Sequence, residues 1–277
     1  MGGALAVAAA GVVAAGCAPG AHDVARRATT TTTTTPTTTA VTVPSVPTTA
    51  PTTTVGPSFP AVVVQAMSQF QPLAAGAEAP LRLPQEPGYI TAQTGGLGGQ
   101  DNVTLVVTAQ PVPVDSPQLS TSQTTELASF ATTATASAST AQGQLAQQRN
   151  LAIGSCGGAA QPLTLADGTA ATTCPTLDGA AVTWQHDGWA VQVVTLSGQA
   201  PSTSEASQIE SALGTAPLPA SAGGFVSVQV PANASVGSST TAAVEWAAGA
   251  DDYQVRSTDD PVGALEVASA MRPYPGG

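Results

Sequence analysis

Residues able to carry out acid–base or nucleophilic chemistry are scarce in this sequence. Of the two histidines, His22 lies in a low-complexity segment that cannot build a pocket. His186 is followed by Asp187 and Gly188, a pair typical of hairpin turns, so we expect it to be exposed and to have a structural or incidental role. The chain contains no nucleophile elbow, zinc-protease helix, phosphate-binding loop or dinucleotide fingerprint. The sequence therefore predicts no catalytic residue and no cofactor, and a hydrolase is the weakest function class.

The three cysteines divide by position into Cys17, near the amino terminus, and the pair Cys156 and Cys174. Cys156 lies in a Gly-rich segment, 154–158. Its composition is like that of a nucleophile loop, but the residue spacing of a nucleophile elbow is absent. In an oxidising compartment Cys156 and Cys174 are well placed to form a disulfide, worth about 3 kcal/mol in the chain-entropy model. The alternative is a pair of unbonded, buried thiols.

Two acidic pairs, Asp251-Asp252 and Asp259-Asp260, offer carboxylate oxygens of the kind that calcium prefers. Their spacing is not that of a calcium loop. Asp259 and Asp260 directly precede a predicted helix, where acidic side chains offset the positive amino-terminal end. The sequence therefore predicts no metal site.

The three tryptophans stand out because aromatic residues make up only 4% of the chain. Each of Trp184, Trp189 and Trp246 buries a large area, so we expect them to anchor a core between a sheet and helices. The alternative is that they line an apolar groove under a curved sheet, as in lipid carriers.

The overall charge excludes some partners. The net charge is −11, and all six basic residues are arginines. Nucleic acid is not an expected partner because phosphate neutralisation needs a basic face. The same acidity opposes an electrostatic hold on anionic lipid, so attachment to a membrane has to be hydrophobic or covalent.

The first sixteen residues have the layout of a signal peptide. The apolar run from Leu5 to Ala15 is too short to span a bilayer, and small residues directly precede Cys17. Residues 14–17 resemble a bacterial lipobox, which implies cleavage before Cys17 and its modification by a diacylglycerol with acyl chains such as palmitate. Ala14 departs from the usual larger aliphatic residue, and the missing basic residues suggest a natural start farther upstream. Ordinary secretory cleavage and an uncleaved helix remain alternatives.

Residues 17–57 form a Thr- and Pro-rich stretch with an unbroken run of threonines at 29–35. Such a composition cannot bury a core, and it favours an extended, polyproline-like stalk of roughly 3 Å per residue. It is also typical of O-glycosylated segments in secreted proteins. We predict a disordered stalk that holds a globular domain, 58–277, away from the outer face of the cell membrane.

Hydrophobic periodicity predicts a mixed domain after residue 57. A first segment, 61–70, has apolar residues at helical spacing. Strands follow it, then two hairpins with Asp-Gly turns and a helix. Helices are expected at 61–70, 139–148, 203–213 and 261–271, strands at 79–84, 102–109 and 126–135, and hairpins at 163–173 and 181–194.

A strand–turn–strand–helix unit is predicted twice. Residues 242–246 align with 180–184, and each segment ends in a tryptophan, Trp246 and Trp184. The following strands and helices match less closely. An internal duplication explains the match, but so does the common occurrence of this order of elements.

The segment from Val182 to Trp189, preceded by Leu165 to Ala170, resembles part of a group of actinobacterial secreted lipoproteins of unknown function. It is more distantly similar to extracytoplasmic domains of anti-sigma-factor regulators and to lipoprotein carriers. The resemblance covers about a quarter of the chain and implies a curved antiparallel sheet backed by helices. It implies no catalytic residue.

We therefore expect an α+β domain in which a curved antiparallel sheet is packed on one face by helices. The expected function is a non-enzymatic binding or sensing role in the cell envelope, with an envelope protein as one class of partner. The alternative is a carrier that holds a lipid or another hydrophobic ligand between sheet and helices.

Overall fold

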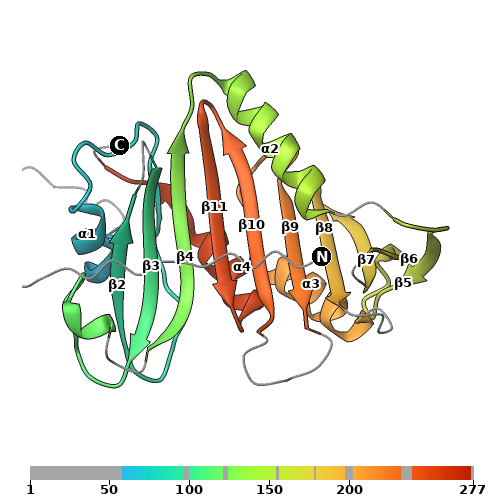
Figure 1. Cartoon of the computed structure of the whole chain (residues 1–277), viewed down its shortest axis with the longest axis horizontal. Helices are drawn as coiled ribbons and strands as arrows, with labels where there is room; N and C mark the ends of the chain where they lie inside the picture. Colours follow the sequence, from blue (N-terminus) through green and yellow to red (C-terminus); the bar gives the residue numbers. More distant parts are fainter. Residues whose placement is uncertain are drawn as a thin grey trace, which may run out of the picture. The chain divides into compact units, whose positions relative to one another are not determined.

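A ten-stranded sheet organises the part of the chain that the computed structural model describes (Figure 1). That part comprises residues 58–96, 100–120, 124–153, 156–177, 179–196, 202–231 and 239–275. The predicted signal peptide, 1–16, the lipidation site Cys17 and the stalk, 17–57, lie outside the described residues.

In chain order the elements are α1 (Ala61–Met67), β1 (Glu78–Pro80), β2 (Tyr89–Gly95), β3 (Gln100–Thr108), the 3-10 turn η1 (Pro117–Ser120), β4 (Thr125–Ala134), α2 (Ala138–Ala152), β5 (Gln161–Thr164), β6 (Ala170–Pro175), β7 (Gly179–His186), β8 (Trp189–Leu196), α3 (Thr203–Thr215), β9 (Phe225–Val230), β10 (Thr241–Ala248), β11 (Asp251–Thr258), α4 (Pro261–Ala270) and β12 (Met271–Pro273). No described helix is both long and apolar enough to cross a membrane.

The large sheet has the strand order β2-β3-β4-β11-β10-β9-β8-β7-β6-β5, and β1 pairs with β12 in a separate two-stranded sheet. All neighbours in the large sheet are antiparallel except β8 and β9, which are parallel. A parallel pair needs a crossover connection, and α3 lies within the one that joins β8 to β9. The predicted α+β class with a mostly antiparallel sheet is confirmed.

Local sequence explains the turns and helix ends. The β7–β8 turn places Asp187 at φ 45° and Gly188 at φ 86°, the left-handed conformations that a two-residue hairpin turn requires. At the start of α4 the Asp260 carboxylate accepts a hydrogen bond from the Gly263 backbone N–H at 2.9 Å, and Pro261 follows the cap. The structural interpretation of Asp260 as a helix-start residue is therefore confirmed.

One face of the sheet is covered by α1, α3 and α4, which enclose the main core. The alternation of side chains along β10 and β11 places Trp246 opposite Tyr253, and their rings stack with centroids 5.2 Å apart. Trp189 lies against Trp246 at 6.2 Å. All three tryptophans are buried in this core, as the core interpretation requires.

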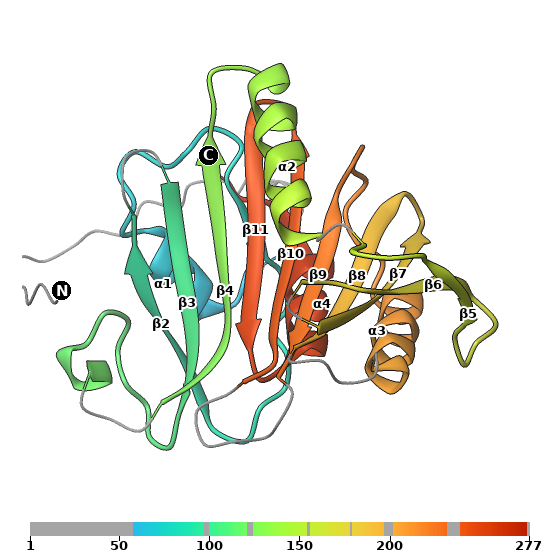
Figure 2. The same cartoon turned by 45° about the vertical axis from the view of Figure 1, so that its right-hand side comes forward.

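The fourth helix, α2, lies on the opposite face (Figures 1 and 2). Its Ala141 and Leu145 pack with Ala190, Phe225 and Ala247, which point away from the main core. The expectation that helices cover one face holds for three of them and is wrong for α2. The physical reason is that β8, β9 and β10 each present an apolar residue on this second face as well.

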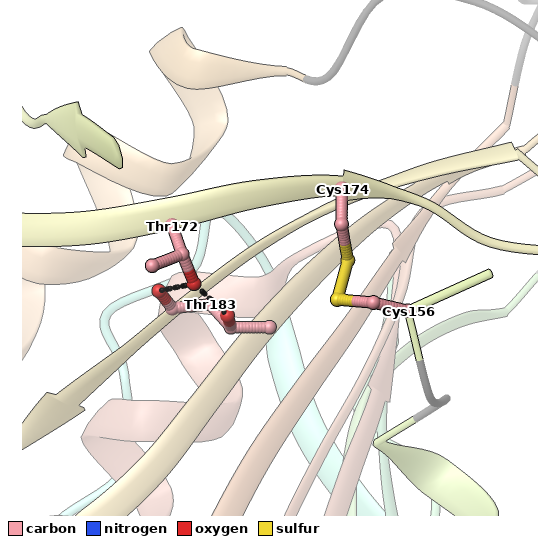
Figure 3. Close-up of a disulfide and its surroundings, with 4 residues drawn as sticks. All are labelled: Cys156, Thr172, Cys174 and Thr183. Carbon is pink, nitrogen blue, oxygen red and sulfur yellow. Dashed lines mark hydrogen bonds between the residues drawn. A yellow bond between two sulfur atoms is a disulfide. The ribbon is translucent and has the colours of Figure 1, made fainter. Parts of the chain in front are cut away.

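A disulfide between Cys156 and Cys174 fastens the segment after α2 to β6 (Figure 3). The Cα atoms are 5.5 Å apart, and the backbone N–H of Gly157 donates to the Pro175 carbonyl at 2.8 Å. The predicted pairing is confirmed. Cys156 therefore has no free thiol, which removes the basis for a nucleophile in this loop.

Candidate functional site

A polar groove runs along the sheet beside α2. It consists of two hollows, of about 420 Å³ and about 330 Å³, that share Glu245 of β10 and Arg256 of β11. The smaller hollow, which we call the acidic hollow, is also lined by Asp252 and Gln254 of β11, by Gln100 of β3 and Thr133 of β4, and by Gln148 of α2. The larger hollow extends toward β9 and ends at Ala152 of α2.

The groove arises because strands alternate their side chains between two faces. Along β11, Tyr253 and Val255 point into the main core, so Asp252, Gln254 and Arg256 point to the α2 side. The pairing register places Gln254 opposite Glu245 on β10. Beside α2 this row of polar residues lines the groove, with Glu245 and Asp252 buried and Arg256 exposed.

Glu245 is a buried carboxylate with one partnered and one unpartnered oxygen. Its side chain is 6% exposed, its Oε1 accepts a hydrogen bond from Gln254 Nε2, and the same oxygen lies 3.6 Å from Arg256 Nη2. Oε2 is buried and has no hydrogen-bond partner among the described residues. Burial raises the pKa of Glu245, while the bond from Gln254 and the charge of Arg256 oppose this rise.

Asp252 is the second buried carboxylate of the acidic hollow. It is 8% exposed, and its Oδ1 has no hydrogen-bond partner in the described part of the chain. Burial, together with the negative charges of Glu245 and Asp251, raises the pKa of Asp252 to about 6. A buried acceptor without a donor costs roughly 1–3 kcal/mol, so the site is suited to a ligand that brings N–H or O–H groups.

Of the two acidic pairs, only Asp252 lines the acidic hollow; Asp251, Asp259 and Asp260 do not. The Asp251 carboxylate lies close to Gly76, so that a Cβ built on Gly76 would be 2.4 Å from Asp251 Oδ2. Burial raises the pKa of Asp251. Within the described ranges, His, Cys, Asp and Glu side chains form no group of three or more that could hold a metal ion.

His186 is less exposed than expected. Its side chain is 19% exposed, and its Nδ1 lies 2.9 Å from Glu210 Oε1 of α3. The pairing register extends β7 through His186, which lies opposite Trp189, so His186 belongs to the strand and not to the turn. The expectation of an exposed turn residue is therefore wrong.

Glu210, the partner of His186, accepts further hydrogen bonds from a side chain of β7 and from one in the turn between β5 and β6. Its Oε2 accepts from the Trp184 Nε1–H of β7, and its Oε1 accepts from the Thr169 hydroxyl at 3.2 Å. Each carboxylate oxygen is thus engaged, and the network fastens α3 to the β7–β8 hairpin. We interpret it as structural, in agreement with the role expected for His186.

Replacing Glu210 with alanine should lower the free energy of unfolding by about 2–3 kcal/mol, because the buried Trp184 N–H would lose its acceptor and a cavity would remain. Urea denaturation followed by circular dichroism measures this. Gln208→Ala, an exposed position on the same helix, serves as the control and should change stability by less than about 0.5 kcal/mol. Equal effects of the two substitutions would contradict the structural role of Glu210.

Sequence reasoning did not find the acidic hollow, although one signal was available. Glu245 interrupts an otherwise small and apolar strand, Thr241–Ala248, at a position flanked by Val244 and Trp246. A charged residue in such a strand either faces solvent on an open side of the sheet or is buried with a partner or a function. Glu245 was therefore a signal of a site on this strand.

No protein-family model matches the chain, and no curated protein or solved structure is significantly similar to it. The resemblance to secreted lipoproteins stays a prediction.

Proposed function

We propose that the chain is a non-enzymatic binding or sensing module of the cell envelope. In this proposal a diacylglycerol on Cys17 anchors it to the outer face of the membrane, and the stalk, 17–57, carries the folded domain. The observation that carries the binding role is the acidic hollow, where two buried carboxylates, Glu245 and Asp252, each retain an unpartnered oxygen. An occupant that donates hydrogen bonds would satisfy both.

Lack of catalytic geometry supports a binding role over an enzymatic one. His186 is engaged with a buried carboxylate on the other side of the sheet, and Cys156 is oxidised to a disulfide. The acidic hollow offers acceptors and amides, but its described lining includes no Ser, Cys or Lys nucleophile.

A carrier of a lipid or another hydrophobic ligand is the second candidate. It is favoured by a hollow of about 450 Å³ whose lining includes the apolar residues Leu218, Trp246 and Met271, beside the charged residues Glu78 and Arg272. Against it, Trp184, Trp189 and Trp246 pack into the core and leave their rings in contact with protein. We therefore rank the polar groove first.

Native mass spectrometry of the full chain, extracted from its membrane in mild detergent, tests the proposal. We expect a non-covalent small molecule to accompany the parent and the control variant Glu266→Gln, an exposed residue of α4. The ligand should be absent from Asp252→Asn. A lipid that stays bound in Asp252→Asn would instead favour the carrier, and a preparation without any ligand would count against the proposed role.

We further propose that the sheet is curved and that it contains an internal duplication. The units β7–β8–α3 and β10–β11–α4 have the same order of elements, and Trp184 and Trp246 each lie two residues before the end of their first strand. Both tryptophans point into the same core. These likenesses support a common origin.

A further inference from the structure

We propose that the acidic hollow binds the ammonium group of a small, polar ligand. This inference rests on the proposed binding function and specifies the chemistry of its ligand. It depends on how four strands and one helix bring polar side chains together at Asp252 and Glu245.

The floor of the hollow is a row of polar residues across three neighbouring strands. Gln100 of β3 pairs with Thr133 of β4, and Thr133 pairs with Asp252 of β11. Gln148 of α2 lines the hollow from the helix side. All of these side chains can form hydrogen bonds, so the pocket suits a ligand with polar groups in several directions.

The charge of the hollow is negative where the ligand would be held. Asp252 and Glu245 are both at least nine-tenths buried. Burial raises the pKa of each carboxyl group, and the negative charge of Glu245 raises the pKa of Asp252 further. Arg256, the cation of the groove, is 58% exposed and approaches Glu245 at Oε1, so the buried Oε2 keeps its acceptor capacity. Glu245 Oε2 and Asp252 Oδ1 are thus left without hydrogen-bond donors from the described residues.

An ammonium group supplies the missing hydrogen-bond donors and positive charge better than the other common polar groups. It brings three N–H donors and one positive charge, which would satisfy Glu245 Oε2 and Asp252 Oδ1 and relieve the repulsion between the carboxylates. A hydroxyl would donate one hydrogen bond and leave the charge uncompensated. A carboxylate or phosphate on the ligand would be repelled.

The size of the hollow restricts the ligand to a small molecule. Its volume of about 330 Å³ lies at the lower end of the range of roughly 300–1,000 Å³ that ligand sites occupy. Its position on an open sheet face allows the rest of the ligand to extend into the larger hollow past Arg256.

The ammonium interaction should depend on pH because Asp252 must be ionised. The charged groups near it are Glu245 on β10, Asp251 and Arg256 on β11 and, in the adjoining hollow, Glu126 on β4; α2 contributes the neutral Gln148. Since the pKa of Asp252 is raised to about 6, lowering the pH to 5 protonates most of this carboxyl group. Affinity for a cation should therefore fall about tenfold between pH 7.5 and pH 5.

Calorimetric titration of the full chain tests the inference with two matched pairs of probes. The ammonium probes are 1,5-diaminopentane and glucosamine, and the neutral counterparts are pentane-1,5-diol and glucose. At pH 7.5 we expect at least one ammonium probe to bind at least tenfold more tightly than its neutral counterpart. Asp252→Asn and Glu245→Gln should each weaken this binding at least tenfold, while Glu266→Gln should leave it unchanged.

Thermal melting followed by circular dichroism accompanies the titrations and shows whether each variant is folded. If either Asp252→Asn or Glu245→Gln fails to fold, the binding measured with the remaining variant decides the test. Equal binding of an ammonium probe and its neutral counterpart would overturn the ammonium inference, as would the absence of binding by both ammonium probes. If a neutral ligand accompanies the parent in mass spectrometry and is lost from Asp252→Asn, the binding function stands and the ammonium inference fails. If no ligand accompanies the parent and no probe binds, both fail.

Discussion

Replacing Trp246 with alanine is expected to lower the free energy of unfolding by about 3–5 kcal/mol, the range for removing a large aromatic side chain from a core. Trp246 is 1% exposed and lies on β10, between two other strands of the large sheet. It stacks on Tyr253 and touches Trp189, so its loss removes two aromatic contacts as well as buried area.

Urea denaturation followed by far-ultraviolet circular dichroism measures this loss without relying on tryptophan fluorescence, which the substitution itself changes. Trp246→Phe should cost less, because part of the ring contact with Tyr253 remains. Leu177→Ala, at a fully exposed position, should change stability by less than about 0.5 kcal/mol. A loss below about 1 kcal/mol for Trp246→Ala would show that Trp246 does not anchor the core.

Cys17→Ala should abolish lipid attachment and release the chain from the membrane. Two acyl chains on one residue give stable anchoring, whereas the chain's acidity offers no electrostatic substitute on anionic lipid. We expect incorporation of a tagged fatty acid to fall at least tenfold relative to the parent and the protein to move from the membrane fraction to the soluble one.

The matched control is the double variant Cys156→Ser, Cys174→Ser, which removes the other two cysteines and should keep the fatty-acid label. Protein amounts are normalised by immunoblot because this control lacks the disulfide. Labelling of Cys17→Ala as strong as that of the parent would contradict the anchor and, with it, the predicted compartment.

Local features of the fold were predictable from neighbouring residues. The Asp187-Gly188 turn, the capping by Asp260 and the pairing of Cys156 with Cys174 follow from residue types and short spacings. β2, β9 and β12 were not predicted. In β9, Ser227 and Gln229 alternate with valines, a strand signal that was available.

The candidate site was not predictable by the same means. Alternation shows that Glu245 and Asp252 each share a face with the residues two positions away along their strand, but it does not show which strands lie side by side. The acidic hollow joins Gln100, Gln148 and Asp252, which come from three distant parts of the sequence. Likewise, the sequence of α2 does not reveal that it covers the face opposite to the other helices.

The strand order has a consequence for how the protein is made. β11 follows β4 to β10 in the chain, yet it lies between β4 and β10, inside the large sheet. A polypeptide interrupted before Asp251 would therefore lack an interior strand and would leave facing backbone edges of β4 and β10 unpaired. The β5–β8 meander can pair as its own residues emerge, but β4 gains its second neighbour, β11, only after β5 to β10 have been synthesised.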